Sequence, residues 1–459
     1  MKTYQDWLQV ASRSEQDRML FIKGAITEYK GSFAYRQAKV GEDYYAGQNT
    51  TIKRYEKIIY NARGQAIPDY TSANHRIATR FFFRDVTQAN AVLLGNGITW
   101  ANGSGEEALG DDFDRKILDA GRTAQVEGVA FGFYNNNKVD IFEAREFVPF
   151  FDEEDGALKA GIRFWQISDD KPLRATMFEL DGYTEYIWGE RDEQGNVIDQ
   201  NGAIKQEKRA YIVEKMVSEA DGEEIYDFKN YPSFPIVPCY ANLLKMSELN
   251  PIRATIDAID LIQSGYANDI DDANVIYWTI SNAGAMDDAD LIKMIDKLKK
   301  VHATQVDDDQ QITSHTVEPT YQGREAILER LEKTLYKDAM ALNTDDIASG
   351  AVTATQIEAS YEPLNQKLDL FEAQITDFIN GLLAIAGVED EPTYTRSIMV
   401  NKTETIQSIV NSALYLDDEY ITEKIMTILG DKDKIEDVQD AKAQTDIQRM
   451  MGRGVNGEQ

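Results

Sequence analysis

Residues 250–272 read NPIRATIDAIDLIQSGYANDIDD, and residues 320–342 read TYQGREAILERLEKTLYKDAMAL. Both stretches predict long helices, because apolar residues recur every three or four positions in each. Asn250-Pro251 predicts the start of the first helix, since proline's missing N–H costs nothing at the first helical position. Each stretch has about 23 residues, which gives a rod of roughly 35 Å at 1.5 Å per residue. Two matched rods predict an antiparallel pair, with residues 274–318 as a small module at its tip and residues 343–353 as a loop after it.

The apolar positions of the two rods predict how they pack. In the first rod, Ile252, Ile262 and Ile270 belong to the same stripe as the packing residues. We expect three side chains from each rod to hold the pair together: Ile256, Ile259, Tyr266, Leu328, Leu331 and Leu335.

Outside the two rods, the sequence predicts helices mixed with antiparallel strands, so the fold class is α+β. The first 30 residues are expected to form an irregular or helical arm. Helices are expected over 52–59, 74–94 and 111–126, and the helix over 74–94 has an apolar stripe that starts at Ile77.

Six segments with a period of two follow, and dipeptides such as Asp155-Gly156 separate them, which predicts a meander. These segments cover residues 140–142, 147–151, 161–167, 174–180, 184–188 and 209–213. After the rods, residues 354–387 predict a helix that is broken or kinked near Pro363, and residues 389–459 are expected to be mostly helical.

The chain is strongly acidic. It has 79 Asp and Glu against 48 Lys and Arg, for a formal charge of −31. This balance argues against a protein that coats nucleic acid by neutralising its phosphates. It is compatible with plain solubility and also with a surface past which nucleic acid slides without sticking.

The most basic short patch consists of lysines on a helix expected over residues 289–301. They are Lys293, Lys297, Lys299 and Lys300. They form either a solvated face or a contact patch for an acidic partner or DNA.

Catalytic and metal motifs are missing from the sequence. The one cysteine, Cys239, lies in an apolar context that favours packing, and the three histidines are scattered. There is no nucleophile elbow, phosphate-binding loop or dinucleotide fingerprint, so no cofactor is expected. Carboxylate pairs such as Asp345-Asp346 arise by chance among so many acidic residues. No signal peptide or membrane span is expected, which favours a soluble protein of a reducing compartment.

A series of short motifs resembles one family in their order along the chain. The motifs are Tyr44-Tyr45-Ala-Gly47, Asn74-His-Arg76 through Leu93-Leu-Gly-Asn-Gly97, Gly128-Val-Ala-Phe-Gly-Phe-Tyr134, Phe234-Pro-Ile-Val-Pro238 before Ile256-Asp257-Ala258-Ile259-Asp260, and Ser349-Gly350 with Thr353-Ala-Thr-Gln-Ile357. In this order they resemble the portal (head–tail connector) proteins of tailed double-stranded DNA bacteriophages, in the branch of long-tailed phages of Gram-positive bacteria. Gln356 departs from the pattern, because family members often have Glu there.

The resemblance implies a portal subunit with named parts. The wing with its N-terminal arm would be residues 1–237, and a wing helix would be residues 354–388. The two stem helices would be residues 238–273 and 319–342, with a small α/β clip at 274–318 between them. The tunnel loop would be residues 343–353, and a helical crown would be residues 389–459. The clip lysines would contact a partner. The tunnel loop would face DNA through Thr344, Asp345, Asp346, Ser349, Gly350 and Thr353.

The resemblance also implies partners. The subunits would form a ring, usually of twelve, through which double-stranded DNA enters and leaves a capsid. A terminase motor, a head-completion adaptor, and capsid and scaffolding proteins would bind the ring. The protein would be a non-enzymatic component of the virion, assembled in the host cytoplasm and away from membranes.

Two other classes remain open from the residues alone. One is a different virion assembly subunit, which predicts no long rod pair lining a pore. The other is an acidic hydrolase, which predicts that neutralising either of two specific carboxylates abolishes turnover.

Overall fold

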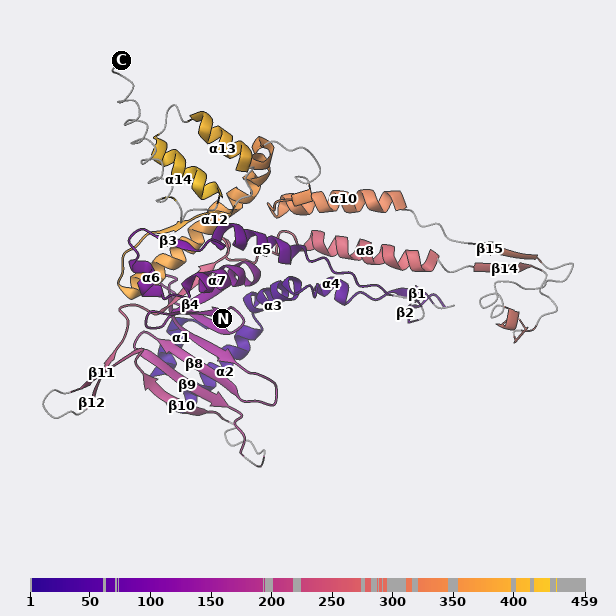
Figure 1. Cartoon of the computed structure of the whole chain (residues 1–459). Coiled ribbons are helices and arrows are strands. Elements are labelled where there is room, and N and C mark those ends of the chain that lie inside the picture. Colours follow the sequence, from indigo (N-terminus) through magenta and orange to yellow (C-terminus); the bar gives the residue numbers. More distant parts are fainter. Residues whose placement is uncertain are drawn as a thin grey trace, which may run out of the picture.

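The computed structural model describes residues 2–60, 63–70, 72, 74–192, 194, 201–217, 224–273, 277–281, 287, 289–290, 292–294, 311–315, 321–345, 354–397, 402–412, 417–429 and 435. Within these ranges, no helix is both long and apolar enough to cross a bilayer. Figure 1 shows a body of mixed helices and sheets, from which two helices project side by side.

The projecting helices are α8 (Arg253–Ala273) and α10 (Tyr321–Asp338), hereafter the helix pair. At their far end, β14 (Tyr277–Ser281) pairs antiparallel with β15 (Gln311–His315), so the chain leaves on α8 and returns on α10 (Figure 1). The predicted antiparallel pair is confirmed. Residues 289–290 and 292–294 are helical as expected, and the remainder of the helix predicted over 289–301 lies outside the described residues.

The helix α8 begins later than its predicted cap. Residues 248–252 form turns, in which the Leu249 carbonyl accepts hydrogen bonds from the amides of Ile252 at 3.1 Å and Arg253 at 2.8 Å. Pro251 therefore precedes the helix instead of opening it.

A five-stranded antiparallel sheet in the order β10-β9-β8-β7-β6 makes up the lower part of the body in Figure 1. Its strands are β6 (Phe147–Phe151), β7 (Leu158–Trp165), β8 (Leu173–Glu179), β9 (Gly182–Trp188) and β10 (Ala203–Arg209). Each strand pairs with the next in sequence, which confirms the predicted meander. Residues 140–142, expected in the meander, lie instead in a separate three-stranded sheet. Of residues 209–213, only Arg209 belongs to the meander, at the end of β10, and the others lead into a separate two-stranded hairpin.

The other sheets are smaller. The three-stranded sheet consists of β4 (Val129–Tyr134), β5 (Val139–Glu143) and β13 (Ile236–Tyr240). Besides β14 with β15, three pairs of strands form two-stranded sheets: β1 (Ile58–Tyr60) with β2 (Ala66–Pro68), β11 (Ile212–Val217) with β12 (Glu224–Lys229), and β3 (Ile98–Trp100) with β16 (Pro392–Tyr394). Cys239 of β13 is fully buried, as its apolar context predicts.

The N-terminal helices α1 (Tyr4–Ala11) and α2 (Glu15–Lys30) pack on the meander. Trp7, Ile22 and Tyr29 share a buried cluster with Phe150 of β6 and Met177 of β8. The expected arm is thus helical and part of the body.

The long helix α12 (Ala354–Ala386) forms the centre of the largest core, with α5 (Phe81–Leu94) and α7 (Phe113–Glu127) packed against it. It runs through Pro363 as one helix, so of the two expected outcomes the break is wrong, while the kink stays a prediction. Pro363 lies on the exposed face, and so does Ala359, whose carbonyl loses its helical partner to the proline. Water can hydrate that carbonyl, while buried Leu364 anchors the other face.

The remaining described helices are α3 (Phe33–Tyr45), α4 (Thr50–Lys53), α6 (Ser104–Leu109), α13 (Lys402–Asn411) and α14 (Asp418–Leu429). The last two helices agree with the mostly helical character expected after residue 389, although Pro392–Tyr394 form strand β16.

Two predicted helices are shorter than expected. The helix over 52–59 ends at Lys53, and Ile58–Tyr60 form strand β1 instead. The helix over 74–94 begins only at Phe81. Residues 74–80, hereafter the strap, follow an extended path beside α8 (Figure 1). Ile77, expected to be a core residue of that helix, is 42% exposed.

Candidate functional site

The helix pair is the feature that the sequence singles out, and its root is held by an apolar cluster. Ile256 and Ile259 of α8 are buried there with Leu335 of α10. Leu328 and Leu331 are half-buried against the same cluster. The body contributes Tyr44, Phe81, Phe82, Val86 and Val126, so the pair is built into the body rather than hinged on it.

Beyond Ile259 the buried face of α8 becomes polar. The buried residues there are Asp260, Ser264 and Asn268, spaced four apart on one face. The apolar stripe predicted to continue through Ile262 and Ile270 does not do so, because Ile262 is only half-buried and Ile270 is 40% exposed. Tyr266, expected in the packing stripe, is half-buried, and the Arg324 guanidinium of α10 lies 6.0 Å from its ring.

The strap binds this polar face through its backbone. The amides of Thr79, Ile77 and His75 donate to Asp260 Oδ1 at 2.7 Å, Ser264 Oγ at 2.9 Å and Asn268 Oδ1 at 2.7 Å. Two residues of extended chain span about 6.6 Å, and four residues of helix rise about 6 Å, so the two repeats match. Since the order of partners reverses, the strap runs antiparallel to α8.

This pairing explains why residues 74–80 are not helical. A helix would require the amides of this segment to bond carbonyls four residues earlier. Alternate amides of the strap donate instead to side-chain oxygens of α8. Asp, Ser and Asn side chains compete in this way with the hydrogen bonds of a helix.

Both ends of the strap have further contacts. Asn49 Nδ2 donates to Asp260 Oδ2 at 2.5 Å and to the Thr79 carbonyl at 3.1 Å. At the other end, His75 Nε2 lies 2.5 Å from Asp271 Oδ2. Burial raises the pKa of Asp260 to about 6, although the hydrogen bonds from Asn49 and Thr79 lower it. The strap contact is therefore sensitive to pH at its most buried point.

The return of the chain from α10 to α12 is also anchored. Lys367 Nζ of α12 donates to both carboxylate oxygens of buried Asp85 at 3.0 Å and to the Ala339 carbonyl at 3.1 Å. Leu342 exchanges two backbone hydrogen bonds with the Gln88 amide group, at 2.9 and 3.2 Å. Burial raises the pKa of Asp85, and the charge of Lys367 opposes that shift. These contacts fix the point from which residues 343–353 depart.

Part of the predicted loop and tip residues can be placed. Thr344 and Asp345 are exposed and helical, whereas Asp346, Ser349, Gly350 and Thr353 lie outside the described residues. At the tip, Lys293 is exposed and pairs with Asp290 at 3.3 Å. Lys297, Lys299 and Lys300 lie outside the described part of the chain, so nothing is shown about a lysine cluster.

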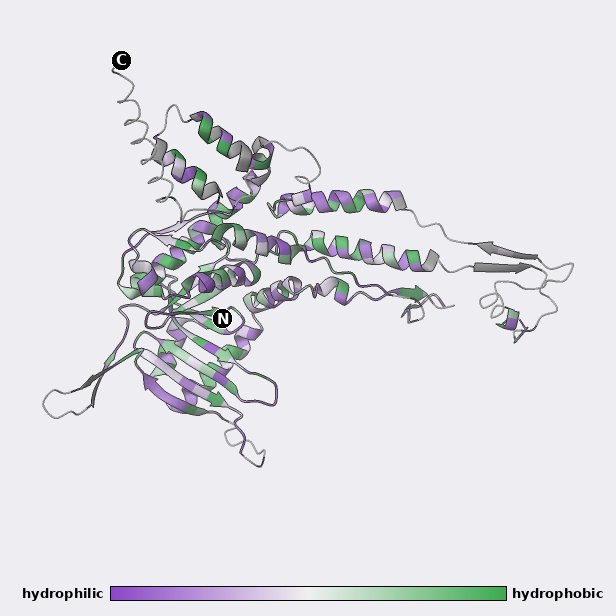
Figure 2. Cartoon of the chain, viewed as in Figure 1, coloured by the Kyte–Doolittle hydropathy of each residue, from purple (hydrophilic) through white to green (hydrophobic). Residues whose placement is uncertain are grey.

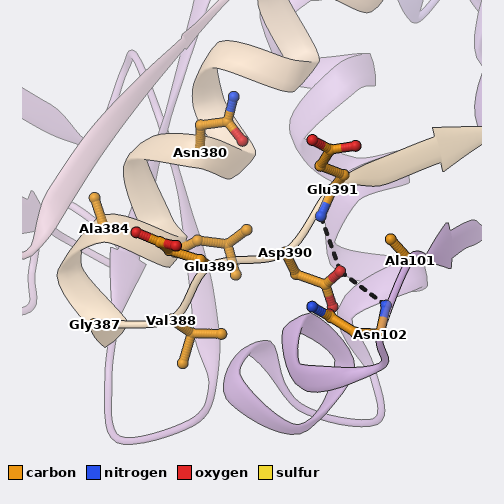
Figure 3. A pocket seen from close by; sticks show the side chains of 10 residues that line it. Ala101, Asn102, Asn380, Ala384, Gly387, Val388, Glu389, Asp390 and Glu391 are labelled. Atoms are coloured by element: carbon orange, nitrogen blue, oxygen red, sulfur yellow. Dashed lines mark hydrogen bonds between the residues drawn. The ribbon is translucent and has the colours of Figure 1, made fainter.

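The body also has a cavity of about 790 Å³, lined by the end of α12, the segment that follows it and residues 101–102 before α6 (Figure 3). Asp390 at its wall accepts hydrogen bonds from the amides of Gly105 at 2.8 Å, Asn102 at 3.1 Å and Glu391 at 2.8 Å. It thereby satisfies donors at the start of α6, which is a structural role. Among the described residues, no group of three or more His, Cys, Asp or Glu side chains could hold a metal ion.

A protein-family model described as "Phage portal protein, SPP1 Gp6-like" matches residues 29–448. The chain belongs to this portal protein family. The match covers nearly the whole chain, and it confirms the family that the ordered short motifs indicate.

Individual relatives are distant. A portal protein of Clostridium phage phiCD119 is 29% identical over 185 residues, which are 38% of this chain and 41% of that relative's length. The chain thus aligns with about two fifths of that relative. Among solved structures, a chain of the native gene transfer agent virion has a TM-score of 0.43 at 11% identity, covering 76% of this chain and 89% of its own. A chain from the neck of an empty gene transfer agent particle has the same TM-score and identity, covering 80% and 96%.

The sequence of this portal family member predicts neither the strap nor its partners. Asp260, Ser264 and Asn268 have helical spacing, which is a detectable signal, but a polar row beside an apolar stripe is usually solvent-exposed. The Asn74-His-Arg76 motif predicts a helix, but the side chain that binds the His75 amide lies almost 200 residues further along the chain.

Proposed function

We propose that this portal family protein forms a ring-shaped channel at a capsid vertex and conducts double-stranded DNA into and out of the capsid. The observation that carries the proposal is the projecting helix pair in a chain whose family match spans residues 29–448. Helix pairs arranged around an axis make a hole, and the bodies make the surrounding rim. In this assignment residues 238–273 and 319–342 are the stem, 274–318 the clip and 343–353 the tunnel loop.

The proposed subunit has further parts outside the channel. The body, residues 1–237 with 354–388, is the wing, and residues 389–459 are the crown. The protein takes a structural role without catalysis. It resides in the virion after assembly in the host cytoplasm. Its proposed partners are further copies of itself, a terminase motor, a head-completion adaptor, and capsid and scaffolding proteins.

The negative charge of α8 and of the whole chain favours a channel through which DNA passes without being bound. The helix α8 has five acidic side chains and one basic one, in a chain with a net charge of −31. A wall of this sign repels phosphate, so DNA meets little sticking along it. A basic wall would instead hold DNA by releasing counterions.

Photo-crosslinking from residue 345 in assembled particles tests the proposal. A benzophenone amino acid at Asp345 is expected to capture DNA in DNA-filled heads and not in empty ones. The same amino acid at Ile167, an 87% exposed position on a body loop, serves as the control. Equal capture of DNA from both positions, or capture only from Ile167, would contradict the assignment of residues 343–353 to the channel.

A further inference from the structure

The hairpin β1–β2 exposes an unusual amount of apolar surface. All six of its residues are exposed, with Ile58 at 56% and Tyr60 at 74%. Figure 2 shows the hairpin with a green, hydrophobic strand at the end of the strap. An isolated two-stranded hairpin is marginally stable in water, and exposed apolar patches on soluble proteins mark interaction sites. This hairpin therefore needs a partner.

The segment around the hairpin has the opposite charge from the rest of the chain. Residues 49–80, which include the hairpin and the strap, contain six Lys and Arg but two Asp and Glu, a formal charge of +4. The whole chain has a charge of −31. Exposed cationic residues of this segment include Lys53, Arg54 and Arg76. The partner should present carboxylates.

A suitable row of carboxylates lies on α10. Glu325, Glu329 and Glu332 are exposed and spaced four and three apart, so they share one face of the helix. Glu329 also pairs with Lys333 at 2.7 Å, on the exposed surface. This row does not meet the hairpin of its own chain, because α8 separates α10 from the strap (Figure 1).

Helical geometry places the two charged surfaces on different flanks of the helix pair. The strap binds α8 at Asp260 and Ser264, whereas α10 packs against α8 through the cluster that includes Ile256 and Ile259. These two faces of α8 point in different directions, since at about 100° per residue the Asp260 and Ser264 face lies roughly 90° around the helix from the Ile256 and Ile259 face. One flank is cationic and apolar, and the other presents the row of three glutamates, with Lys333 beside Glu329.

Such a distribution favours a head-to-tail contact between copies. A cationic surface repels its own copy across a two-fold axis but attracts the glutamate row of the next molecule. Repeating a head-to-tail contact closes a ring when the rotation permits. We infer that the β1–β2 hairpin of one copy, together with the nearby Lys53, Arg54 and Arg76, docks on the neighbouring copy. Its docking surface there is the row of Glu325, Glu329 and Glu332. This inference rests on the proposed ring. DNA is the less favoured partner, because Ile58, Ile59 and Ile67 offer nothing to phosphate.

A charge-swap experiment tests the inference. One variant carries Lys53→Glu, Arg54→Glu and Arg76→Glu, a second carries Glu325→Lys, Glu329→Lys and Glu332→Lys, and a third combines all six changes. A control with Glu154→Lys, Asp169→Lys and Glu190→Lys makes the same change in net charge as the second variant, at exposed positions on the body. Thermal melting checks that each variant is folded, and light scattering gives the protein concentration at half-assembly.

We expect each of the first two variants to raise that concentration at least tenfold at low salt, the combined variant to restore it, and the control to leave it unchanged. High salt should shrink the differences, because it screens exposed charges. Assembly of both triple variants at the wild-type concentration would overturn the docking while leaving the ring. Normal rings of the first variant with weaker DNA binding would assign the surface to DNA. Failure of the wild-type protein to form rings under any condition would overturn the ring itself.

Discussion

The backbone amide of Thr79 donates a hydrogen bond to the carboxylate of Asp260 at 2.7 Å, across 181 positions of sequence. This bond begins the contact between the strap and α8, and Asn49 completes it from α4. Because α5 follows the strap directly, the contact links the position of a projecting helix to a helix of the body core. Loss of the strap should therefore loosen the helix pair without unfolding the body.

Removing one strap bond should destabilise the protein locally. We expect Ser264→Ala to cost about 1–2 kcal/mol, because the Ile77 amide loses its partner in a partly buried contact. Gln263→Ala, one position away on the half-buried side of α8, is the control and should change stability by less than about 0.5 kcal/mol. Hydrogen exchange of residues 75–80 measures the effect. An unchanged exchange rate in Ser264→Ala would show that the strap is held by other contacts.

The Asp260 carboxyl should make stability depend on pH in a predictable direction. Its pKa is raised by burial to about 6 from an ordinary value of 3.8, so the folded state binds the proton more tightly than the unfolded state. Between roughly pH 4 and 6 the folded protein holds more protons, and stability falls as pH rises. Compared with Asp260→Asn, which does not titrate, the wild type should lose melting temperature from pH 4 to pH 7. A difference between the two proteins that stays constant with pH would contradict this.

The apolar root should dominate the stability of the helix pair. Leu335→Ala should cost about 2–5 kcal/mol, because this side chain is buried in the cluster between α8, α10 and the body. Ile327→Ala on the same helix removes a 51% exposed side chain and should cost far less, under about 1 kcal/mol. Urea unfolding followed by circular dichroism compares the two. Similar costs would mean that α10 does not depend on this cluster.

The ion pair between Asp85 and Lys367 should behave as a buried one. Lys367→Met leaves the Asp85 carboxylate buried without its partner, which should cost about 3–5 kcal/mol. Adding Asp85→Leu should recover much of that loss, since the uncompensated charge is then gone. Lys333→Met, in an exposed pair with Glu329, provides the contrast at under about 1 kcal/mol. A double variant no more stable than Lys367→Met would indicate a specific need for the charges.

The sequence predicts the helix pair because its signal is local. Ile256, Ile259 and Leu335 recur at helical spacing, and burial in the structure follows that spacing at the root. Prediction fails where the partner is remote in sequence. Residues 74–80 continue an apolar helical pattern into Phe81, but the side chains that bind their amides come from α8.

A second wrong prediction follows from the rule that proline interrupts a helix, which packing overrides in α12. Pro363 predicts a break, but buried residues on the opposite face of α12 hold the helix together, and solvent hydrates the proline's side. The loop and tip assignments stay predictions: the structure places Thr344, Asp345 and Lys293 without testing their roles, and the other residues lie outside the described ranges.

The most direct test of the account is the mass and shape of the purified protein, measured by light scattering and negative-stain imaging over a range of concentration and salt. We predict a closed ring with a central hole and a mass that is a multiple of 51.9 kDa, with added salt favouring assembly by screening the acidic surfaces. A monomer under all conditions, or a closed particle with no axial hole, would contradict the proposal that the helix pairs surround a channel.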